Sequence, residues 1–598
     1  MIWSLLANAT ELLMKRSMLY LVCALAMSPF SVYSQQDNKT IIYSGDIYSA
    51  DASNPHPEAI GIEGEKIVAV GKYQDVLKLV GEHARQIDLK GRYLMPGLID
   101  THAHVANAGF QTLTLEFPGG LQDAAAVRAF VAKNKDNPQR DLHGVQYYSN
   151  VPLDYWDRIS LLDSVFNAPE YKNTPVVLGG ADAHTGWANQ AMLRKAGLTT
   201  EKLRHADSAF KAGTGLTADG KISGFVTEGA WDFVMNAIPA VDDETLSRAI
   251  IAGADAMNQF GITAWMDPLS NIRPLSPMFD ASPNRNDVGL LPAYSALAKA
   301  DRLTAHVSGL ALVNINAGPS IIDDVLALRD KFSQSPDFRL AGIKIFQDGV
   351  IEYPSQTAKL SLPYLNRPGY RGSESLNKTR FCQLITRTDA EHLIAHFHAI
   401  GDRAVEESLD AVACARKANG NSETLHSITH LEVVSPQSYP RFQQLNVAAS
   451  MQLLWAGKDG DGATTTLLEG KVPAPLLTHL YPAGDLYRHH ALIAGASDLP
   501  VSSANPLLAI YTAVTRRGEL GELPPDSEKI SREAMLQAYT LNAAKVIGRG
   551  DEIGSLSVGK SADFALFDRN LEKVSIEELR DAKVVWTMFE GRQVYQAE

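Results

Sequence analysis

The chain has 598 residues, of which 45% are hydrophobic, so it can bury a large core as several domains or as one large barrel with additions. The net charge is −13 and no basic block stands out, which excludes a surface built to neutralise phosphates, so we expect no nucleic acid among the partners. The three cysteines have no metal-ligand spacing. We expect Cys382 and Cys414 to be two buried thiols, with a disulfide between them as the alternative.

The N-terminus predicts a targeting segment. Two basic residues precede an apolar run at 18–27 that contains Cys23, and residues 32–34 offer a cleavage site before Gln35. We therefore expect residues 1–34 to be a signal peptide with an upstream extension, and the mature protein to be periplasmic or secreted, without stable membrane association after cleavage. The alternative is an uncleaved anchor, although the apolar run is short for a membrane span.

Both ends of the mature chain predict strands. Short alternating apolar runs separated by turns fill residues 39–70, and similar runs return within 562–589. Between them, strand and helix signals alternate, which is the pattern of a parallel barrel with insertions. We expect an α/β fold in which a distorted (β/α)8 TIM barrel occupies residues 98–548. The segments on either side of it, 35–97 and 549–598, would form one small β-sandwich.

The most informative stretch is residues 95–105, where an apolar strand leads into His102 and His104. Side chains alternate along a strand, so two histidines at this spacing share one face and can hold one metal ion. At the carboxyl end of a barrel strand they would lie where such folds carry their chemistry. A lone His-x-His is more often a packed or surface pair, but the later sites along the chain favour a metal site.

Four later sites appear in a regular order. Lys344 lies in an apolar strand, where an ammonium without a partner is costly, so this lysine needs a special role. His398 and His430 each end a further strand, and Asp498 ends a fourth. Asp498 could instead cap a following helix. Capping alone would not explain why four successive strands each carry a residue that can bind a metal.

At these residues the chain resembles the amidohydrolase superfamily, in the branch that contains N-substituted formamide deformylase. The resemblance runs from about Ile41 to the C-terminus. It implies a distorted (β/α)8 barrel with one or two divalent metal ions, and zinc is the expected metal. The metal ligands that it implies are His102, His104, Lys344, His398, His430 and Asp498. Asp498 would also act in catalysis by accepting a proton from the bound water, and Lys344 matches a lysine that in some members is carboxylated and bridges two metals.

The long interval between His104 and Lys344 must contain insertions, and we expect substrate specificity to reside there. Within it, residues 180–189 and 224–228 resemble family motifs near the substrate pocket. His184 would act in catalysis and substrate binding by orienting the scissile carbonyl or its oxyanion, and a hydrogen-bonded structural role is equally open. Glu228 is the weaker candidate for substrate binding, because a single glutamate is usually solvated.

Three other histidines receive different assignments. His396 shares a strand face with His398 by alternation, and we expect it to be a core residue or to lie behind the ligands. His489 and His490 precede the strand that leads to Asp498, and we expect them on a helix surface.

Together, these features predict a metal-dependent hydrolase that cleaves a C–N bond other than a peptide bond, of amide or formamide type, with metal-activated water as the nucleophile. The partner would be a small-molecule substrate, and a homo-oligomer stays open. Hydrolysis of an ester, a lactone or a carbamate on the same site is the alternative within the fold. A non-catalytic, metal-binding receptor is the alternative from another class, but a receptor would need no proton shuttle such as Asp498.

Overall fold

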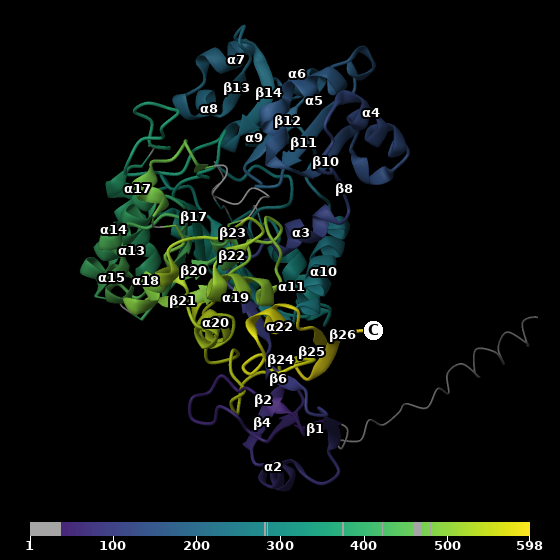
Figure 1. Ribbon diagram of the computed structural model, residues 1–598, viewed down its shortest axis with the longest axis vertical. Coiled ribbons are helices and arrows are strands. Elements are labelled where there is room, and N and C mark those ends of the chain that lie inside the picture. Colours follow the sequence, from purple (N-terminus) through teal and green to yellow (C-terminus); the bar gives the residue numbers. More distant parts are fainter. Residues whose placement is uncertain are drawn as a thin grey trace, which may run out of the picture.

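The computed structural model describes residues 38–279, 283, 285–286, 288–373, 376–420, 423–458, 468–478 and 480–598. The predicted signal peptide, residues 1–34, lies outside the described residues, and Cys23 with it. In the described part of the chain, no helix combines the length and the apolar character that a membrane span requires. Three parts follow one another along the long axis of the molecule: a sheet formed by an inserted segment, a barrel, and a small pair of sheets (Figure 1).

Eight parallel strands form a sheet that is nearly closed into a barrel, which confirms the predicted α/β barrel. Almost every residue of these strands is buried, as expected for parallel strands that helices cover on the outside. The backbone N–H of Thr101 donates to the carbonyl of Gly495 at 3.0 Å and so joins the ends of the first and last strands. In their order around the barrel, the strands are β7 (Leu98–Asp100), β15 (Ile262–Asp267), β16 (His306–Leu312), β17 (Phe338–Phe346), β18 (Ile394–Ala399), β19 (His426–His430), β20 (Val447–Met451) and β21 (Leu492–Gly495).

Amphipathic helices cover the outside of the barrel. In α10, the buried residues Leu246, Ile250 and Met257 lie on one helix face. Gly109 of α3 packs directly on α10, because a Cβ atom at this glycine would lie 1.8 Å from the carbonyl oxygen of Ala249. This close approach fixes the helix that follows the histidine motif. The helices of this part are α3 (Val105–Gln111), α10 (Asp243–Gln259), α11 (Leu291–Lys299), α12 (Ile321–Phe332), α13 (Lys378–Ala390), α14 (Asp402–Asn419), α15 (Tyr439–Gln444), α17 (Ala474–Leu477), α18 (Ala483–Arg488), α19 (Pro506–Thr515), α20 (Arg532–Ala538) and α21 (Leu541–Val546).

The segment between the first two barrel strands forms a sheet of its own, with apolar cores on both faces. Tyr147 and Trp231 belong to one core, whereas Tyr148 and Trp187 belong to the other. Neighbouring tyrosines reach opposite cores because side chains alternate along a strand. The strands are β8 (Leu115–Glu116), β9 (Asp141–Leu142), β10 (Val145–Val151), β11 (Val176–Gly180), β12 (Thr185–Ala188), β13 (Thr214–Leu216) and β14 (Ile222–Thr227). The helices are α4 (Ala124–Lys133), α5 (Ile159–Phe166), α6 (Gln190–Ala196), α7 (Thr200–His205), α8 (Ser208–Ala212) and α9 (Glu228–Met235).

The two ends of the described chain form a pair of packed sheets, the arrangement of a β-sandwich. The first sheet has the order β4-β3-β1-β5, and the second, β2-β6-β24-β25-β26, combines strands from both ends. Ile42 and Ile60 of the first sheet share one core with Phe564 and Trp586 of the second. The strands are β1 (Lys39–Tyr43), β2 (Asp46–Ile47), β3 (Ala59–Glu63), β4 (Lys66–Gly71), β5 (Arg85–Asp88), β6 (Tyr93–Pro96), β24 (Phe564–Phe567), β25 (Val584–Phe589) and β26 (Arg592–Gln596), with helices α2 (Tyr73–Val80) and α22 (Ile576–Arg580).

A buried histidine links the barrel to the second of these sheets. Nδ1 of His306 lies 2.9 Å from a carboxylate oxygen of Asp337, and Nε2 lies 3.0 Å from Asp563, which directly precedes β24. Burial by itself lowers the pKa of His306, but the charge of Asp563 and the contact with Asp337 outweigh burial and raise the pKa to about 9. The imidazole is therefore a cation at neutral pH.

We expect the free energy of unfolding to fall as the pH rises through this range. The pKa of His306 is about 6.5 in an unfolded chain, so its stabilisation is complete below about pH 6.5 and is lost as the pH rises through the folded value of about 9. Denaturant unfolding at about pH 6.5 and pH 9 measures the loss, which should be on the order of 2–3 kcal/mol. His306→Gln should reduce the difference between the two pH values, and an unchanged difference would contradict this assignment.

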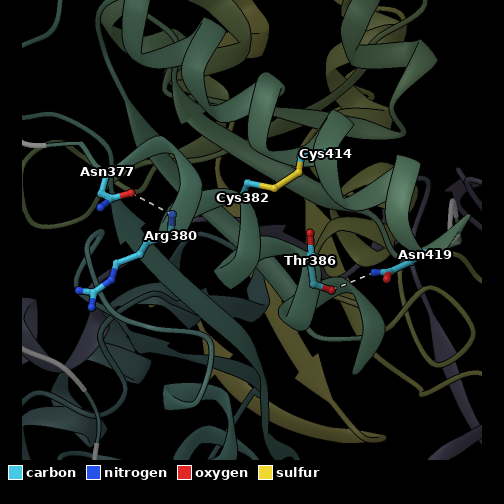
Figure 2. The surroundings of a disulfide bond; sticks show 6 residues. All are labelled: Asn377, Arg380, Cys382, Thr386, Cys414 and Asn419. Atoms are coloured by element: carbon cyan, nitrogen blue, oxygen red, sulfur yellow. Dashed lines mark hydrogen bonds between the residues drawn. A yellow bond between two sulfur atoms is a disulfide. The ribbon is translucent and has the colours of Figure 1, made fainter.

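Cys382 and Cys414 form a disulfide, so the prediction of two buried thiols is wrong. The two cysteines lie on the neighbouring helices α13 and α14, with Cα atoms 5.8 Å apart, a distance that a disulfide spans (Figure 2). The pairing depends on how these helices pack beside β18. The spacing of the two cysteines in the sequence does not reveal that packing.

The double variant Cys382→Ser/Cys414→Ser should lose about 3–4 kcal/mol of its free energy of unfolding, because a cross-link that closes a loop of 32 residues restricts the unfolded chain. Denaturant unfolding of the variant and of the unreduced wild type measures this loss. Thiol titration of the unreduced, denatured wild type provides the control. Free thiols at these two positions would contradict the pairing.

Candidate active site

The carboxyl ends of the barrel strands surround one cavity. All six residues that the sequence predicts as metal contacts line this cavity: His102, His104, Lys344, His398, His430 and Asp498. They lie in or directly after β7, β17, β18, β19 and β21. The barrel therefore brings together side chains that are far apart in the sequence.

The two histidines of the opening motif follow their strand rather than lying in it. β7 ends at Asp100, whose Oδ1 accepts the backbone N–H of His102 at 3.0 Å and that of Ser497 at 3.1 Å. His104 is the residue before α3. Strand alternation is therefore the wrong reason for placing both histidines together, although both do reach the cavity.

His102, His104 and Asp498 form a tight cluster of ligand atoms. Oδ1 of Asp498 lies 3.3 Å from Nε2 of His102 and 3.2 Å from Nε2 of His104. One ligand atom from each of the three residues lies within 4.8 Å of the others, which suits a single metal ion. Burial and the nearby charge of Lys344 hold the pKa of His102 well below its usual value, so its imidazole is neutral, the form that binds metals.

Asp498 does not cap a helix. The next helix, α19, begins at Pro506 and is capped by Asn505, whereas Asp498 lies in a turn with φ of 59°. Its backbone N–H donates to the carbonyl of His102 at 2.8 Å. Burial raises the pKa of Asp498, but the hydrogen bond with His104 and the nearby cationic groups outweigh burial and lower the pKa to about 2. The side chain is an ionised carboxylate that can bind a metal or accept a proton.

His398 and His430 lie together in the same cavity, with their ring centroids 4.3 Å apart. His430 is 1% exposed, and neither of its ring nitrogens has a hydrogen-bond partner among the described residues. A buried polar atom without a partner is costly. A divalent metal ion held by these histidines would remove that cost, so the residues fit the metal that the resemblance implies.

Asp348 contacts His398, a role that the sequence did not reveal. Its Oδ1 lies 3.3 Å from Nδ1 of His398, and its carboxylate accepts the backbone N–H groups of Ile400 and Gly401 at 3.0 and 2.9 Å. A carboxylate behind a metal-binding histidine orients its ring. The signal in the sequence is the position of Asp348, shortly after the strand that bears Lys344.

Lys344 is fully buried on β17, with Nζ 3.4 Å from Nε2 of His102. Burial lowers the pKa of Lys344 to about 7, although the charge of Asp498 opposes this shift. An unmodified ammonium would need an anionic partner such as Asp348, but the carboxylate of Asp348 contacts His398 and backbone N–H groups. A partly neutral amine is the form that reacts with carbon dioxide, and carboxylation of Lys344 stays a prediction.

Lys344→Ala should therefore lower the number of metal ions bound per chain, because it removes the anion that would bridge two metals. Short carboxylic acids should partly restore the lost metal by filling the vacated space. Elemental analysis of the dialysed variant, with and without acetate, measures both effects. A native mass that shows unmodified Lys344 in a fully metal-loaded wild type would overturn the prediction and indicate a mononuclear centre.

His184 reaches the cavity from the inserted sheet, in the loop between β11 and β12. Its Nδ1 lies 3.2 Å from Oε1 of Glu228, which also accepts the hydroxyl of Thr357 at 2.9 Å. Burial lowers the pKa of His184, but the charge of Glu228 outweighs burial and raises it. Glu228 thus contacts His184 instead of lining the cavity, and by raising the pKa it increases the protonated fraction of the ring, in which the second nitrogen can also donate a hydrogen bond.

The outer wall of the cavity is largely apolar and includes Phe110, Trp231, Met235, Leu275, Met278 and Phe346. Among the described residues that line it, the lysines and arginines are Lys344 and Arg273. Arg273 donates to the carbonyl of Val241 at 2.8 Å and to the carboxylate of Asp243 at 2.6 Å. Lys344 is buried among the candidate metal ligands. Within the described lining, both cationic side chains therefore already have partners.

Of the three other histidines with predicted positions, His396 lies as expected, whereas His489 and His490 lie in the turn after a helix rather than on it. His396 lies behind the ligands, with Nε2 2.6 Å from Nδ1 of His102. His489 and His490 are exposed, and His489 directly follows α18.

Comparisons with known proteins agree with this geometry. The model of a family described as "Amidohydrolase family" matches residues 85–595. Protein LONG AFTER FAR-RED 3 of Arabidopsis thaliana is 27% identical over 570 residues, which cover 93% of this chain and 91% of that protein. N-substituted formamide deformylase of Arthrobacter pascens is 23% identical over 577 residues, which cover 93% of this chain and 98% of that protein. The structure of an uncharacterised metal-dependent hydrolase from Pyrococcus horikoshii OT3 shares the fold, with a TM-score of 0.66, 20% identity, and coverage of 90% of this chain and 99% of that one.

Proposed function

The chain belongs to the amidohydrolase family and is a metal-dependent hydrolase, and from this premise we propose that it cleaves a C–N bond other than a peptide bond, of amide or formamide type. The observation that carries the proposal is the cluster of His102, His104 and Asp498, beside His398 and His430, at the carboxyl ends of the barrel strands. The relative named N-substituted formamide deformylase supports this choice of bond.

The donor set of imidazoles and a carboxylate would hold one or two divalent ions, and zinc suits it. A bound divalent metal supplies Lewis-acid activation of water and of the scissile carbonyl. The ionised Asp498 accepts the proton of the attacking water and returns it to the leaving nitrogen. His184 donates a hydrogen bond to the carbonyl oxygen as negative charge develops there.

The lining of the cavity supports a substrate with an apolar substituent and no carboxylate. Short peptides and N-acyl amino acids carry a carboxylate near the scissile bond. Leaving such a charge buried without a partner costs about 3–5 kcal/mol, and within the described lining Lys344 and Arg273 are both engaged elsewhere. This cost supports the proposal of a C–N bond other than a peptide bond.

Turnover of a matched substrate set tests the proposal. The set contains a formamide, an amide and an ester of one apolar group, together with an N-acyl amino acid of similar size. We expect turnover of the formamide or the amide, and a kcat/KM at least about 100-fold lower for the N-acyl amino acid, as a cost of about 3 kcal/mol implies. Preference for the ester would assign the protein to the ester, lactone and carbamate hydrolases. Metal binding without turnover of any member would favour a receptor.

We also propose that the protein works in the periplasm or outside the cell. Disulfides persist in oxidising compartments, and the bond between Cys382 and Cys414 supports this location. Fractionation of cells that express the full chain, with N-terminal sequencing of the product, tests both the location and the predicted cleavage before Gln35. A cytosolic product with an intact N-terminus would contradict the proposal.

A further inference from the structure

A chain of three polar side chains lies behind the candidate metal centre. Nδ1 of His102 is 2.6 Å from Nε2 of His396, and Nδ1 of His396 is 2.6 Å from the hydroxyl of Ser427. All three residues are buried, with exposed fractions of 1%, 0% and 0% in that order. The strand register places His396 of β18 beside Lys344 of β17 and Ser427 of β19, so the barrel itself holds the chain in place.

The hydrogens of this chain have one arrangement that leaves His102 able to bind a metal. A neutral imidazole has one N–H group and one nitrogen with a free lone pair. Nε2 of His102 faces Asp498 at 3.3 Å and must carry the lone pair to act as a ligand, so its Nδ1 carries the hydrogen and donates to His396. His396 then accepts at Nε2, and its own Nδ1–H donates to the hydroxyl of Ser427.

We propose that His396 and Ser427 are positioning residues that set the tautomer of His102 and thereby raise its affinity for the metal. The inference rests on the proposed metal centre and goes beyond it, because neither residue is a ligand. A metal-binding histidine usually donates to a carboxylate, a carbonyl or a water. Here the partner is a second imidazole, which can also donate. If His396 donated from Nε2, the hydrogen of His102 would move to its own Nε2 and block the metal.

The hydroxyl of Ser427 fits the arrangement that binds metal, although a hydroxyl can also donate to a lone pair on the same nitrogen. With the hydroxyl present, the Nδ1–H of His396 has an acceptor. In Ser427→Ala, that arrangement leaves a buried N–H group without an acceptor, and such a group is costly. The opposite arrangement loses only a donor to the lone pair at the same position, so we expect the balance to shift toward the tautomer of His102 that cannot bind.

Three variants distinguish the hydrogen bond that His396 accepts from the volume that its side chain fills. His396→Leu removes the acceptor for His102 at similar volume, and we expect the zinc dissociation constant to rise by about 10- to 100-fold. His396→Gln places an amide oxygen near the position of Nε2 and should recover most of the affinity. Ser427→Ala should raise the dissociation constant by about 10-fold. The matched control is Ser408→Ala on α14, where the buried hydroxyl donates to the carbonyl of Ala404 at 2.8 Å.

The experiment measures zinc affinity of metal-free full-length protein by competition with a chromophoric chelator, without substrate. Thermal unfolding of each metal-free variant reports whether the fold is kept. Wild-type affinity in both His396→Leu and Ser427→Ala would overturn the proposal, as would equal losses in His396→Gln and His396→Leu. If His396→Leu fails to fold, Ser427→Ala against Ser408→Ala decides: a selective loss supports the inference, and equal affinities overturn it.

This readout is independent of the proposed reaction. A protein that binds zinc but turns over no C–N substrate would refute the proposed function. The zinc affinities of the variants would still decide the role of His396 and Ser427. A wild type that binds no zinc would overturn both.

Discussion

The variant His102→Ala/His104→Ala should bind less metal per chain than the wild type and should have no measurable turnover. The substitutions remove two of the three residues whose ligand atoms lie within 4.8 Å of one another and leave Asp498 as the remaining member. Loss of a group that only supports a ligand already costs about 10- to 100-fold in metal affinity. Loss of two ligands should cost more. Elemental analysis of dialysed protein measures the metal bound per chain.

His489→Ala is the matched control, because His489 is an exposed histidine beside α18 that does not line the cavity. It should keep the metal content of the wild type. Single replacements of His398 and His430 should each reduce metal loading, since both line the same cavity. A normal metal complement in the double variant would show that the opening motif does not bind the metal.

The sequence was sufficient to predict the barrel and six polar residues that share one cavity at its carboxyl end. Buried parallel strands are apolar along their whole length, so a polar residue such as Lys344 or His430 at a strand end is conspicuous. Lys344 and His430 both line the cavity. The regular alternation of strand and helix then places these ends at one face of the barrel, whatever the length of the segments between them.

Features that depend on packing between distant segments were not predictable in the same way. The disulfide between Cys382 and Cys414 depends on the contact of α13 with α14. The chain of His102, His396 and Ser427 depends on the register of neighbouring strands. A single sequence shows the period of each strand but not its register, so such contacts are visible only in the folded barrel.

Asp498→Asn should keep the fold and most of the metal but should lose about 100- to 10,000-fold in kcat, the usual contribution of general acid-base catalysis. The two side chains have nearly the same shape, and the contact that holds the turn, from the backbone N–H of residue 498 to the carbonyl of His102, does not involve the side chain. An amide oxygen can still face the metal, but it cannot accept the proton of water. Because the pKa of Asp498 is about 2, its carboxylate is ionised at any ordinary assay pH, and the loss should not depend on pH.

Metal content and kcat must be measured on the same preparation of Asp498→Asn, because a lost metal would also abolish turnover. Asp410→Asn on α14 is the matched control. The carboxylate of Asp410 is exposed, pairs with Arg441 at 2.7 Å and does not line the cavity, so this variant should retain wild-type activity. Full metal with a large loss in kcat separates proton transfer from metal binding. Near-native turnover with full metal would leave Asp498 as a ligand alone and would require another group to carry the proton to the leaving nitrogen.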